Sequence, residues 1–204
     1  MTGEHWTSVY EQKRTTEVSW FQPQPTLSLE LLTAANVGTD DPILDVGAGA
    51  SVLVDRLLER GYRDVSVLDI SAPALHVAQQ RLGKNASKVA WIVADLLTWK
   101  PERRYKIWHD RAVFHFLTTA EDRARYLDIL RATLDPDGYV IIATFAADGP
   151  TSCSGLPVAR YSPQQLADQF PGFTVVRTER EEHRTPGEVI QPFTWLLLAA
   201  PPTG

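Results

Sequence analysis

The chain has little of several features that would assign it to other classes of protein. Cys153 is its only cysteine, which leaves neither an intrachain disulfide nor a cysteine zinc cluster. No apolar stretch approaches the roughly 20 residues that a membrane-spanning helix needs. The segment Met1–Trp6 lacks the charged-then-apolar pattern of a secretion signal. These absences predict a cytoplasmic protein.

The charge balance argues against two classes of partner. The chain of 204 residues includes 20 Lys and Arg and 25 Asp and Glu, which gives a formal net charge of -5. Bulk electrostatics therefore favours neither nucleic acid nor a membrane surface, and we expect neither as a partner. A hydrophobic content of 44% and a charged content of 22% are ordinary for a globular protein.

Apolar runs alternate with segments of helical spacing along most of the chain. This alternation is typical of a parallel sheet covered by helices on both faces. We therefore predict an α/β fold, a three-layer sandwich whose seven-stranded sheet is mostly parallel and has an antiparallel C-terminal edge strand. The strands are expected at about residues 42–46, 64–69, 88–94, 105–110, 139–145, 173–180 and 193–199.

Helix signals separate these strands. Thr26, Ser71 and Ser162 are expected to cap helices, the last two with a proline close behind. Further helices are expected at about residues 4–14, 52–61 and 120–134, and the sequence Pro136-Asp-Gly138 is expected to turn into the fifth strand.

No linker, internal repeat or low-complexity tract divides the chain. A chain of this length suffices for one domain with a sizeable core, so we expect a single domain over residues 1–204. Residues 1–38 would form an N-terminal helical cap and residues 42–147 the alternating core. Residues 148–204 would supply a loop and a strand pair on the substrate side.

The most informative local pattern is a strand, a tight turn and a helix around Gly47-Ala48-Gly49. Glycines let the backbone approach a ligand closely, and the start of the following helix offers free N–H groups. A dinucleotide fingerprint would need a third glycine at Val52, so that interpretation fails. Asp45 places a carboxylate just ahead of the turn, which favours a cationic or hydroxyl-bearing ligand over a bare pyrophosphate.

The D-x-G-x-G pattern from Asp45 to Gly49 resembles the first motif of class I S-adenosylmethionine (SAM) methyltransferases. Ser51 stands where that family often has a third glycine. Asp69 ends the second strand about 20 residues past the turn, at the spacing of the family's acidic residue. Further matches follow the third and fourth strands and precede the fifth: Asp95-Leu96, Asp110-Arg111 and Pro136-Asp-Gly138.

The resemblance implies SAM as the cofactor and a role for each motif. Asp69 would bind the ribose hydroxyls, with Ile70 beside it, and Asp95 and Leu96 would lie at the adenine. Asp110 would lie beside the transferable methyl group. The remaining cofactor-binding residues would be those of the first motif: Asp45 at the methionine part, and Gly47, Ala48 and Gly49 in the turn.

Each of these residues also has a purely structural interpretation. Asp45 would orient the turn through backbone hydrogen bonds, and Asp69 would cap a helix. Asp110 would merely end its strand. Leu96 would pack in the core.

Aromatic residues precede the first strand at His5-Trp6, Val9-Tyr10 and Trp20-Phe21. They resemble the entry segment of several small class I methyltransferases, including protein-lysine methyltransferases, in which this segment folds over the cofactor. Trp20 is therefore expected in the cofactor site and, with Phe21, as a lid over the methyl group. Trp6 fits the ordinary core at least as well.

Ionisable residues gather where the strands are expected to end. In an open α/β sheet a ligand lies beyond the carboxyl ends of the strands. Asp110 and His115 lie at or just past the fourth strand, and His183 lies just after the sixth, so we predict these three as catalytic residues. Cys153 is more typical of a small buried apolar residue than of a reactive thiol. No metal-ligand spacing is recognisable, so no metal site is predicted.

Three functions remain open from the sequence. The first is a SAM-dependent methyltransferase that acts on a small-molecule acceptor, favoured by the compact chain and a lid of modest length. The second is a protein-lysine methyltransferase, suggested by the resemblance of the entry segment. The third is a non-catalytic SAM-binding domain, against which the intact Gly47, Gly49, Asp69 and Asp110 argue.

Overall fold

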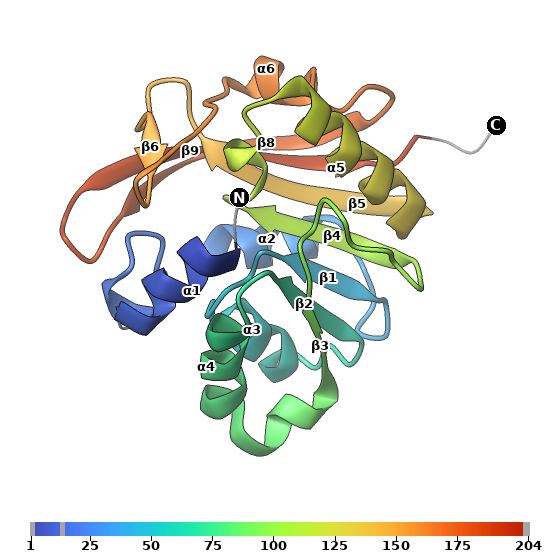
Figure 1. The fold of residues 1–204 in the computed structure, drawn as a ribbon. Coiled ribbons are helices and arrows are strands. Elements are labelled where there is room, and N and C mark those ends of the chain that lie inside the picture. The colour runs from blue at the N-terminus through green and yellow to red at the C-terminus, as the bar shows by residue number, and fades with distance from the viewer. Residues whose placement is uncertain (1–2, 13–14, 202–204) are drawn as a thin grey trace.

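The computed structural model describes residues 3–12 and 15–201 and confirms the predicted α/β fold (Figure 1). Seven strands form one sheet in the order β3-β2-β1-β4-β5-β9-β8. These strands are β1 (Ile43–Val46), β2 (Val65–Asp69), β3 (Val89–Val93), β4 (Tyr105–Arg111), β5 (Leu134–Phe145), β8 (Thr174–Arg184) and β9 (Ile190–Ala199). A separate small hairpin consists of β6 (Ser152–Cys153) and β7 (Leu156–Pro157).

The sheet is parallel from β3 to β5 and antiparallel beyond. β1 pairs in parallel with β2 and β4, and the outer pairs β2–β3 and β4–β5 are also parallel. β9 runs antiparallel to both of its neighbours, so the reversed strand lies between β5 and the edge strand β8. The winding of the parallel strands reverses between β1 and β4, which is where ligands bind in open α/β sheets.

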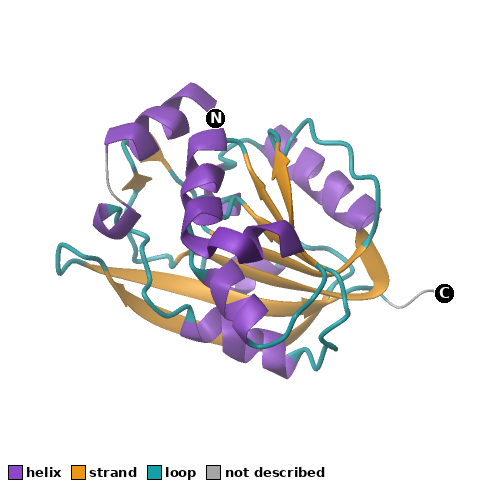
Figure 2. Cartoon of the chain, turned by 90° about the horizontal axis from the view of Figure 1, so that it is seen from below, coloured by secondary structure: helices purple, strands orange, loops and turns teal. Residues whose placement is uncertain are grey.

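Helices cover both faces of the sheet (Figures 1 and 2). One core cluster joins the sheet to α2, α3 and α4, and the other joins it to α5 and α6. The helices are α1 (Gly3–Gln12), α2 (Thr26–Ala34), α3 (Leu53–Glu59), α4 (Ala72–Leu82), α5 (Ala120–Thr133) and α6 (Pro163–Ala167), with 3-10 turns η1 (Thr15–Glu17), η2 (Gly83–Lys88) and η3 (Phe114–Phe116).

The central strands are buried on both faces because successive side chains point to opposite sides of a strand. Ile43 and Ile141 belong to the cluster under α2 to α4, whereas their neighbours Leu44 and Ile142 belong to the cluster under α5 and α6. The sequences of these strands are therefore continuously apolar, as expected for a parallel sheet covered on both faces.

Several local expectations need correction. Thr26 is the first residue of α2 and not its cap, since Pro25 precedes the helix and no side chain caps it. Pro136-Asp-Gly138 lies inside β5, where the pairing with β4 shifts between Tyr105 and Ile107. The C-terminal strands are longer than predicted, so His183 lies within β8, paired with Gln191, and not after the strand.

Other local expectations are confirmed. The Ser71 hydroxyl accepts a hydrogen bond from Ala74 N–H at the start of α4. Ser162 forms a capping box with Gln165 at α6. The helix expected at 4–14 is α1, although residues 13–14 lie outside the described part. Within the described ranges, none of the helices has the length and apolar character to cross a membrane.

Candidate cofactor and acceptor site

Two adjoining cavities lie at the carboxyl ends of the central strands. They share Tyr10, Trp20, Val46, Gly47 and Arg111. The first cavity is also lined by Trp6, Leu68, Asp69, Ile70, Ala94, Asp95, Leu96, Leu97, Ala112, Val113, Phe116, Leu117 and Cys153. The second is also lined by Val18, Phe21, Gln22, Pro25, Ser28, Asp45, Ala48, Ala50, Ser51, Val52, Leu53 and His109.

The turn after β1 has no room for side chains at its two glycines. Gly47 and Gly49 have φ angles of 61° and 54°, a region that side-chain-bearing residues rarely adopt. A Cβ on Gly47 would lie 2.0 Å from Val113 Cγ2, and a Cβ on Gly49 would lie 2.0 Å from the Tyr10 hydroxyl oxygen. The turn therefore packs directly against the loop after β4 and against α1.

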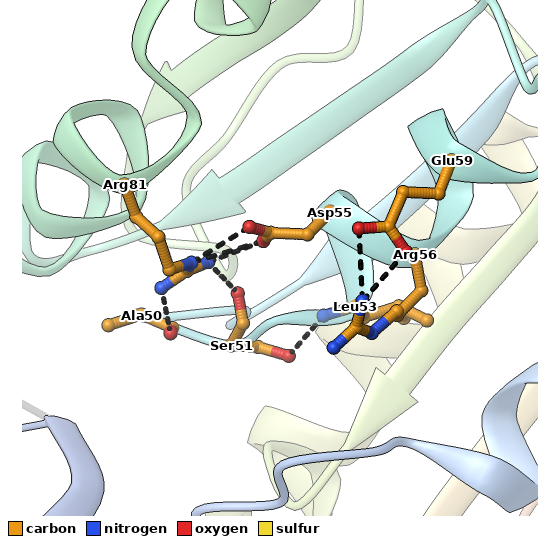
Figure 3. Close-up of polar contacts among 7 residues, drawn as sticks. All are labelled: Ala50, Ser51, Leu53, Asp55, Arg56, Glu59 and Arg81. Carbon is orange, nitrogen blue, oxygen red and sulfur yellow. Dashed lines mark hydrogen bonds and ion pairs between the residues drawn. The ribbon is translucent and has the colours of Figure 1, made fainter.

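Arg81 of α4 anchors the segment that follows the glycines (Figure 3). Its guanidinium donates to the carbonyl oxygens of Ala50 at 2.9 Å and Ser51 at 2.6 Å. It also forms an ion pair with Asp55 of α3 at 2.7 Å. The Ser51 hydroxyl in turn accepts the N–H of Leu53 at 3.1 Å. These contacts fix the turn relative to the two helices that follow β1 and β2.

Asp69 ends β2 and connects the glycine turn to α4. One carboxylate oxygen accepts Gly49 N–H at 2.8 Å, and the other accepts Ser71 N–H at 2.7 Å. Burial raises the pKa of this carboxyl to about 6. An ionised carboxylate offers about four acceptor positions, so these two bonds leave capacity for hydroxyl groups in the first cavity.

The predicted adenine-side residues also reach the first cavity. Ile70 and Leu96 line it together with Asp95, whose Oδ1 accepts Leu97 N–H at 2.9 Å. Asp69 ends β2 and Asp95 follows the adjacent strand β3, so both carboxylates lie at the carboxyl ends of the parallel strands. Two carboxylates that accept hydrogen bonds here suit a ligand that carries hydroxyl and amino groups.

Asp45 lies in a buried chain of polar side chains beneath the second cavity. Its Oδ1 is 2.7 Å from Nδ1 of His109, and Nε2 of that histidine is 2.9 Å from the Ser28 hydroxyl oxygen. Asp45 Oδ2 is buried and has no hydrogen-bond partner. Because an unpaired buried carboxylate oxygen is costly, this atom suits a cationic or hydroxyl group bound in the cavity.

Aromatic side chains from the N-terminal segment close the first cavity. The ring of Trp6 lies edge-on to Trp20 and to Phe116, with centroid distances of 5.8 and 5.2 Å. Trp20 Nε1 donates to the Tyr10 hydroxyl at 3.3 Å. Burial raises the pKa of Tyr10 far above its ordinary value, so this hydroxyl stays neutral. Trp20 and Trp6 thus belong to the same wall of the first cavity, and the lid over the methyl group stays a prediction.

Three residues predicted as catalytic do not line either cavity. The Asp110 carboxylate accepts Val113 N–H at 2.9 Å and the Tyr126 hydroxyl at 2.7 Å, and burial raises its pKa to about 6. His115 is fully buried, which lowers its pKa to about 3, and its Nδ1 is 3.4 Å from Phe145 N. His183 donates from Nε2 to the Ser19 carbonyl at 2.7 Å.

These contacts show how the three side chains are held. Asp110 and His115 sit at the right end of the sheet, but their side chains turn inward under the loop after β4. His183 lies on β8 and binds the N-terminal segment instead of facing a ligand. Burial also lowers the pKa of His183, and the catalytic role of the three residues stays a prediction.

Arg111 was named from the sequence only as part of the Asp110-Arg111 match, without a role of its own. It follows Asp110 at the end of β4, and it lines both cavities. Tyr10 was named only with the entry segment, and His109 only as a residue near the end of the fourth strand. Phe116 and Ser28 were missed, because each reaches the site through contacts between distant segments.

Cys153 also lines the first cavity, from the small hairpin after β5. Burial raises the pKa of its thiol to about 11, so the thiol is protonated at neutral pH. This agrees with the expected apolar role. Among the described residues, no group of three or more His, Cys, Asp or Glu side chains is arranged to hold a metal ion.

The fold and the cavities together define a Rossmann-like protein that binds an adenosine-type cofactor. Three features fit SAM. The carboxylates of Asp69 and Asp95 suit its hydroxyl and amino groups, and the unpaired oxygen of Asp45 suits its ammonium group. The two glycines of the turn let the backbone approach the cofactor. These features follow three neighbouring strands in the order that the sequence motifs predicted.

Comparisons with known proteins agree with this class. The family model of a methyltransferase domain matches residues 43–138. Malonyl-(acyl-carrier protein) O-methyltransferase 1 of Ilyobacter polytropus is 29% identical over 104 residues, which cover 50% of this chain but only 37% of that relative's length. EEF1A lysine methyltransferase 2 of Danio rerio is 26% identical over 192 residues, covering 86% of this chain and 76% of the relative.

A solved structure shows the same fold. The 1,6-didemethyltoxoflavin-N1-methyltransferase of Burkholderia thailandensis, bound to 1,6-didemethyltoxoflavin and S-adenosylhomocysteine, superposes with a TM-score of 0.76 at 22% identity. The match covers 98% of this chain and 87% of that one. Residues 43–138 therefore form a methyltransferase domain, and the chain has the fold of class I SAM-dependent methyltransferases.

Proposed function

We propose that this protein transfers the methyl group of SAM to a nucleophilic atom of a small-molecule acceptor. One observation carries the proposal. The first cavity is lined both by the carboxylates that suit the adenosine part, Asp69 and Asp95, and by the aromatic wall of Trp6, Trp20 and Phe116. A cavity of this kind holds a cofactor on one side and an apolar or planar acceptor on the other.

We further propose how each predicted residue contributes. Asp69 accepts the ribose hydroxyls and Asp95 the adenine amino group, with Ile70 and Leu96 packing beside them. Asp45 binds the ammonium group through its unpaired oxygen. The turn Gly47-Ala48-Gly49 lets the backbone approach the cofactor. Trp20 closes the cavity, whereas Asp110, His115 and His183 act as positioning residues behind its walls.

In methyl transfer, the main task of the protein is to position the acceptor atom. Bound SAM supplies an electrophilic methyl group on a sulfonium. The protein holds the acceptor atom in line with the bond that breaks, and the aromatic wall excludes water. Within the described residues, no histidine lines the first cavity, and its carboxylates Asp69 and Asp95 are assigned to the cofactor, which leaves no base for the acceptor there. A neutral amine or a thiolate therefore suits the site better than a hydroxyl group, which would need a base.

The alternative acceptor is a lysine of a protein. It is supported by the alignment with EEF1A lysine methyltransferase 2, which covers 86% of this chain. Arg111 argues against it, because this cation lines both cavities on the β4 side, whereas the carboxylates of the site are assigned to the cofactor. We also propose a cytoplasmic location and one domain over residues 1–204, supported by the composition, with neither nucleic acid nor membrane as a partner.

Methyl-labelled SAM tests this proposal directly. The protein is incubated with a protein-free metabolite extract and, separately, with a protein extract from which small molecules have been removed. We expect label in extractable small molecules and none in protein bands, and we expect Asp69→Asn to abolish it. Label confined to protein bands would establish the alternative. No label in either extract, with no binding of SAM, would overturn the assignment as an enzyme.

A further inference from the structure

Arg111 is a buried cation whose donors are not all used. Its Nη1 donates to the Trp20 carbonyl oxygen at 2.9 Å. Its Nε and Nη2 are buried and have no hydrogen-bond partner, and the side chain is only 10% exposed. Buried donors on a charged group are costly when they are unpaired, so two such atoms on a side chain that lines both cavities indicate a missing anionic partner.

The nearest carboxylate does not supply that partner. Glu181 of β8 lies 3.9 Å from Arg111 Nη2, too far for a hydrogen bond. Its two oxygens are already engaged, one by Gln22 Nε2 at 2.5 Å and the other by the Trp195 indole N–H at 3.0 Å. Glu181 thus offsets part of the charge of Arg111 and leaves the two donors available.

The guanidinium is held rigidly in place. Its central carbon lies 4.7 Å from the centroid of the Phe193 ring on β9, so the planar group packs on an aromatic face. Together with the bond to Trp20, this contact fixes the direction of the remaining N–H groups. Burial lowers the pKa of Arg111, but a guanidinium remains protonated at neutral pH. A fixed, charged fork of donors is suited to a carboxylate.

The position of Arg111 indicates which bound molecule carries that carboxylate. Arg111 ends β4, and its contacts come from the N-terminal segment, β8 and β9. Asp69 and Asp95, on the adenosine side, follow β2 and β3 on the opposite side of β1. Among the described residues that line the cavities, Arg111 is the only lysine or arginine. We propose that Arg111 binds a carboxylate group of the methyl acceptor.

This inference rests on the proposed function and narrows it to one chemical class. The acceptor is a small molecule that bears a carboxylate, and its nucleophilic atom lies toward the aromatic wall while the carboxylate lies on Arg111. SAM also carries a carboxylate, on its methionine part. The experiment must therefore distinguish a carboxylate of the acceptor from that of the cofactor.

The first arm measures transfer. The protein is supplied with methyl-labelled SAM and a protein-free metabolite extract, and the products are separated on an anion exchanger at about pH 11, where carboxylates are charged and amines are neutral. We expect the label to be retained. Esterification of the extract with acidic methanol should abolish labelling, and mild alkaline hydrolysis of the esters should restore it. Labelling that survives esterification would overturn the proposal.

The second arm uses Arg111→Gln, with Arg160→Gln as the matched control. Arg160 also donates to a carbonyl oxygen, that of Gly149 at 3.0 Å, but it does not line either cavity. We expect Arg111→Gln to lower the yield of anionic product at least about tenfold, the loss typical of a charge-assisted hydrogen bond, and Arg160→Gln to leave it unchanged. An unchanged yield in Arg111→Gln would overturn the proposal.

The third arm separates the two carboxylates by calorimetry with SAM and with decarboxylated SAM. We expect Arg111→Gln to bind both within about threefold of the wild type. Weaker binding of SAM but not of decarboxylated SAM would assign Arg111 to the cofactor and overturn the proposal. Equally weaker binding of SAM and decarboxylated SAM would show that Arg111 only holds Trp20 in place, which would also overturn the proposal. Failure of the wild-type protein to bind SAM would instead overturn the proposed function itself.

Discussion

The two sides of the site are built in different ways. On the cofactor side, at the ends of β1, β2 and β3, the binding groups lie at strand ends and are held by nearby backbone. Asp69, for example, accepts N–H groups of Gly49 and Ser71. On the acceptor side, beyond β4, the groups come from distant segments. Arg111 contacts Trp20 and Phe193, which lie far from it in the chain.

Because of this difference, we expect the cofactor side to tolerate few substitutions and the acceptor side to tolerate more. The cofactor side depends on a backbone conformation that few sequences allow, with two glycines in the left-handed region. The acceptor side depends on side chains, which can change without altering the strands that carry them. We therefore expect substitutions on the cofactor side to affect SAM binding or stability, and those on the acceptor side to affect transfer.

The largest expected effect is the loss of SAM binding in Asp69→Ala. The change removes the proposed acceptor for the ribose hydroxyls and leaves the N–H groups of Gly49 and Ser71 without their partner. At about 1.5–3 kcal/mol for each hydrogen bond to a charged group, SAM affinity should fall at least about 100-fold in calorimetry. Asp64→Ala is the matched control, because its carboxylate pairs with Arg103 at the surface. A loss of less than threefold in Asp69→Ala would contradict this role.

Next in size is the destabilisation expected from Gly47→Ala. The new Cβ would overlap Val113 and would force a residue with a side chain to adopt a φ of 61°. Left-handed strain of about 1–2 kcal/mol and overpacking of about 1–3 kcal/mol predict a loss of about 2–5 kcal/mol in urea unfolding. Gly61→Ala separates the two causes, because its φ is 86° but nothing lies within 4 Å. Equal losses in the two variants would show that the close contact at Gly47 has no cost.

The acceptor side should show a pH-dependent stability that depends on His115. Its pKa is about 3 in the folded protein and about 6.5 in an unfolded chain, so only the unfolded state gains a proton as the pH falls below about 6.5. The contribution of His115 to stability is therefore present above that pH and is lost toward pH 3, by up to about 1.4 kcal/mol per unit.

Urea unfolding of the wild type and His115→Gln between pH 7 and pH 4.5 tests this dependence. The stability of the variant relative to the wild type should rise as the pH falls. The buried carboxylates of Asp69 and Asp110, whose raised pKa values act in the opposite direction, are present in both proteins and cancel in the difference. A difference that does not change with pH would contradict the buried, neutral state of His115.

The smallest expected effect concerns the anchor of the glycine turn. Arg81→Ala removes the bonds to Ala50, Ser51 and Asp55, all of them partly exposed, so we expect a loss of about 1 kcal/mol in unfolding. Arg103→Ala breaks a more exposed ion pair with Asp64 and should cost no more than about 0.5 kcal/mol. Equal losses would mean that Arg81 contributes only as an ordinary surface ion pair.

The same difference between the two sides explains what the sequence could predict. The strands, most helices and the order of the motifs follow from local periodicity, and the cap at Ser71 follows from hydrogen bonding within one turn. The structure also places Asp69, Asp95 and the glycine turn at neighbouring strand ends, because parallel strands bring their carboxyl ends together. These features depend on residues that are close in the chain.

The direction of a side chain near the end of a strand could not be predicted in this way. Asp110 and Arg111 are consecutive, yet the first is buried against Tyr126 and the second lines the cavities. Side chains of consecutive strand residues point to opposite faces of the sheet. An error of one residue in the expected strand end therefore exchanges the buried residue and the residue that lines the cavities. His183 was misplaced because β8 extends beyond its expected end, so its partner on the N-terminal segment was unforeseen.

Calorimetric titration of the wild-type protein with SAM, and separately with NADH, tests the central claim most directly. The glycine turn without a third glycine and the carboxylates of Asp45 and Asp69 predict that SAM binds at a single site and that NADH gives no heat. No heat with SAM at millimolar concentration, or saturable binding of NADH, would contradict the account.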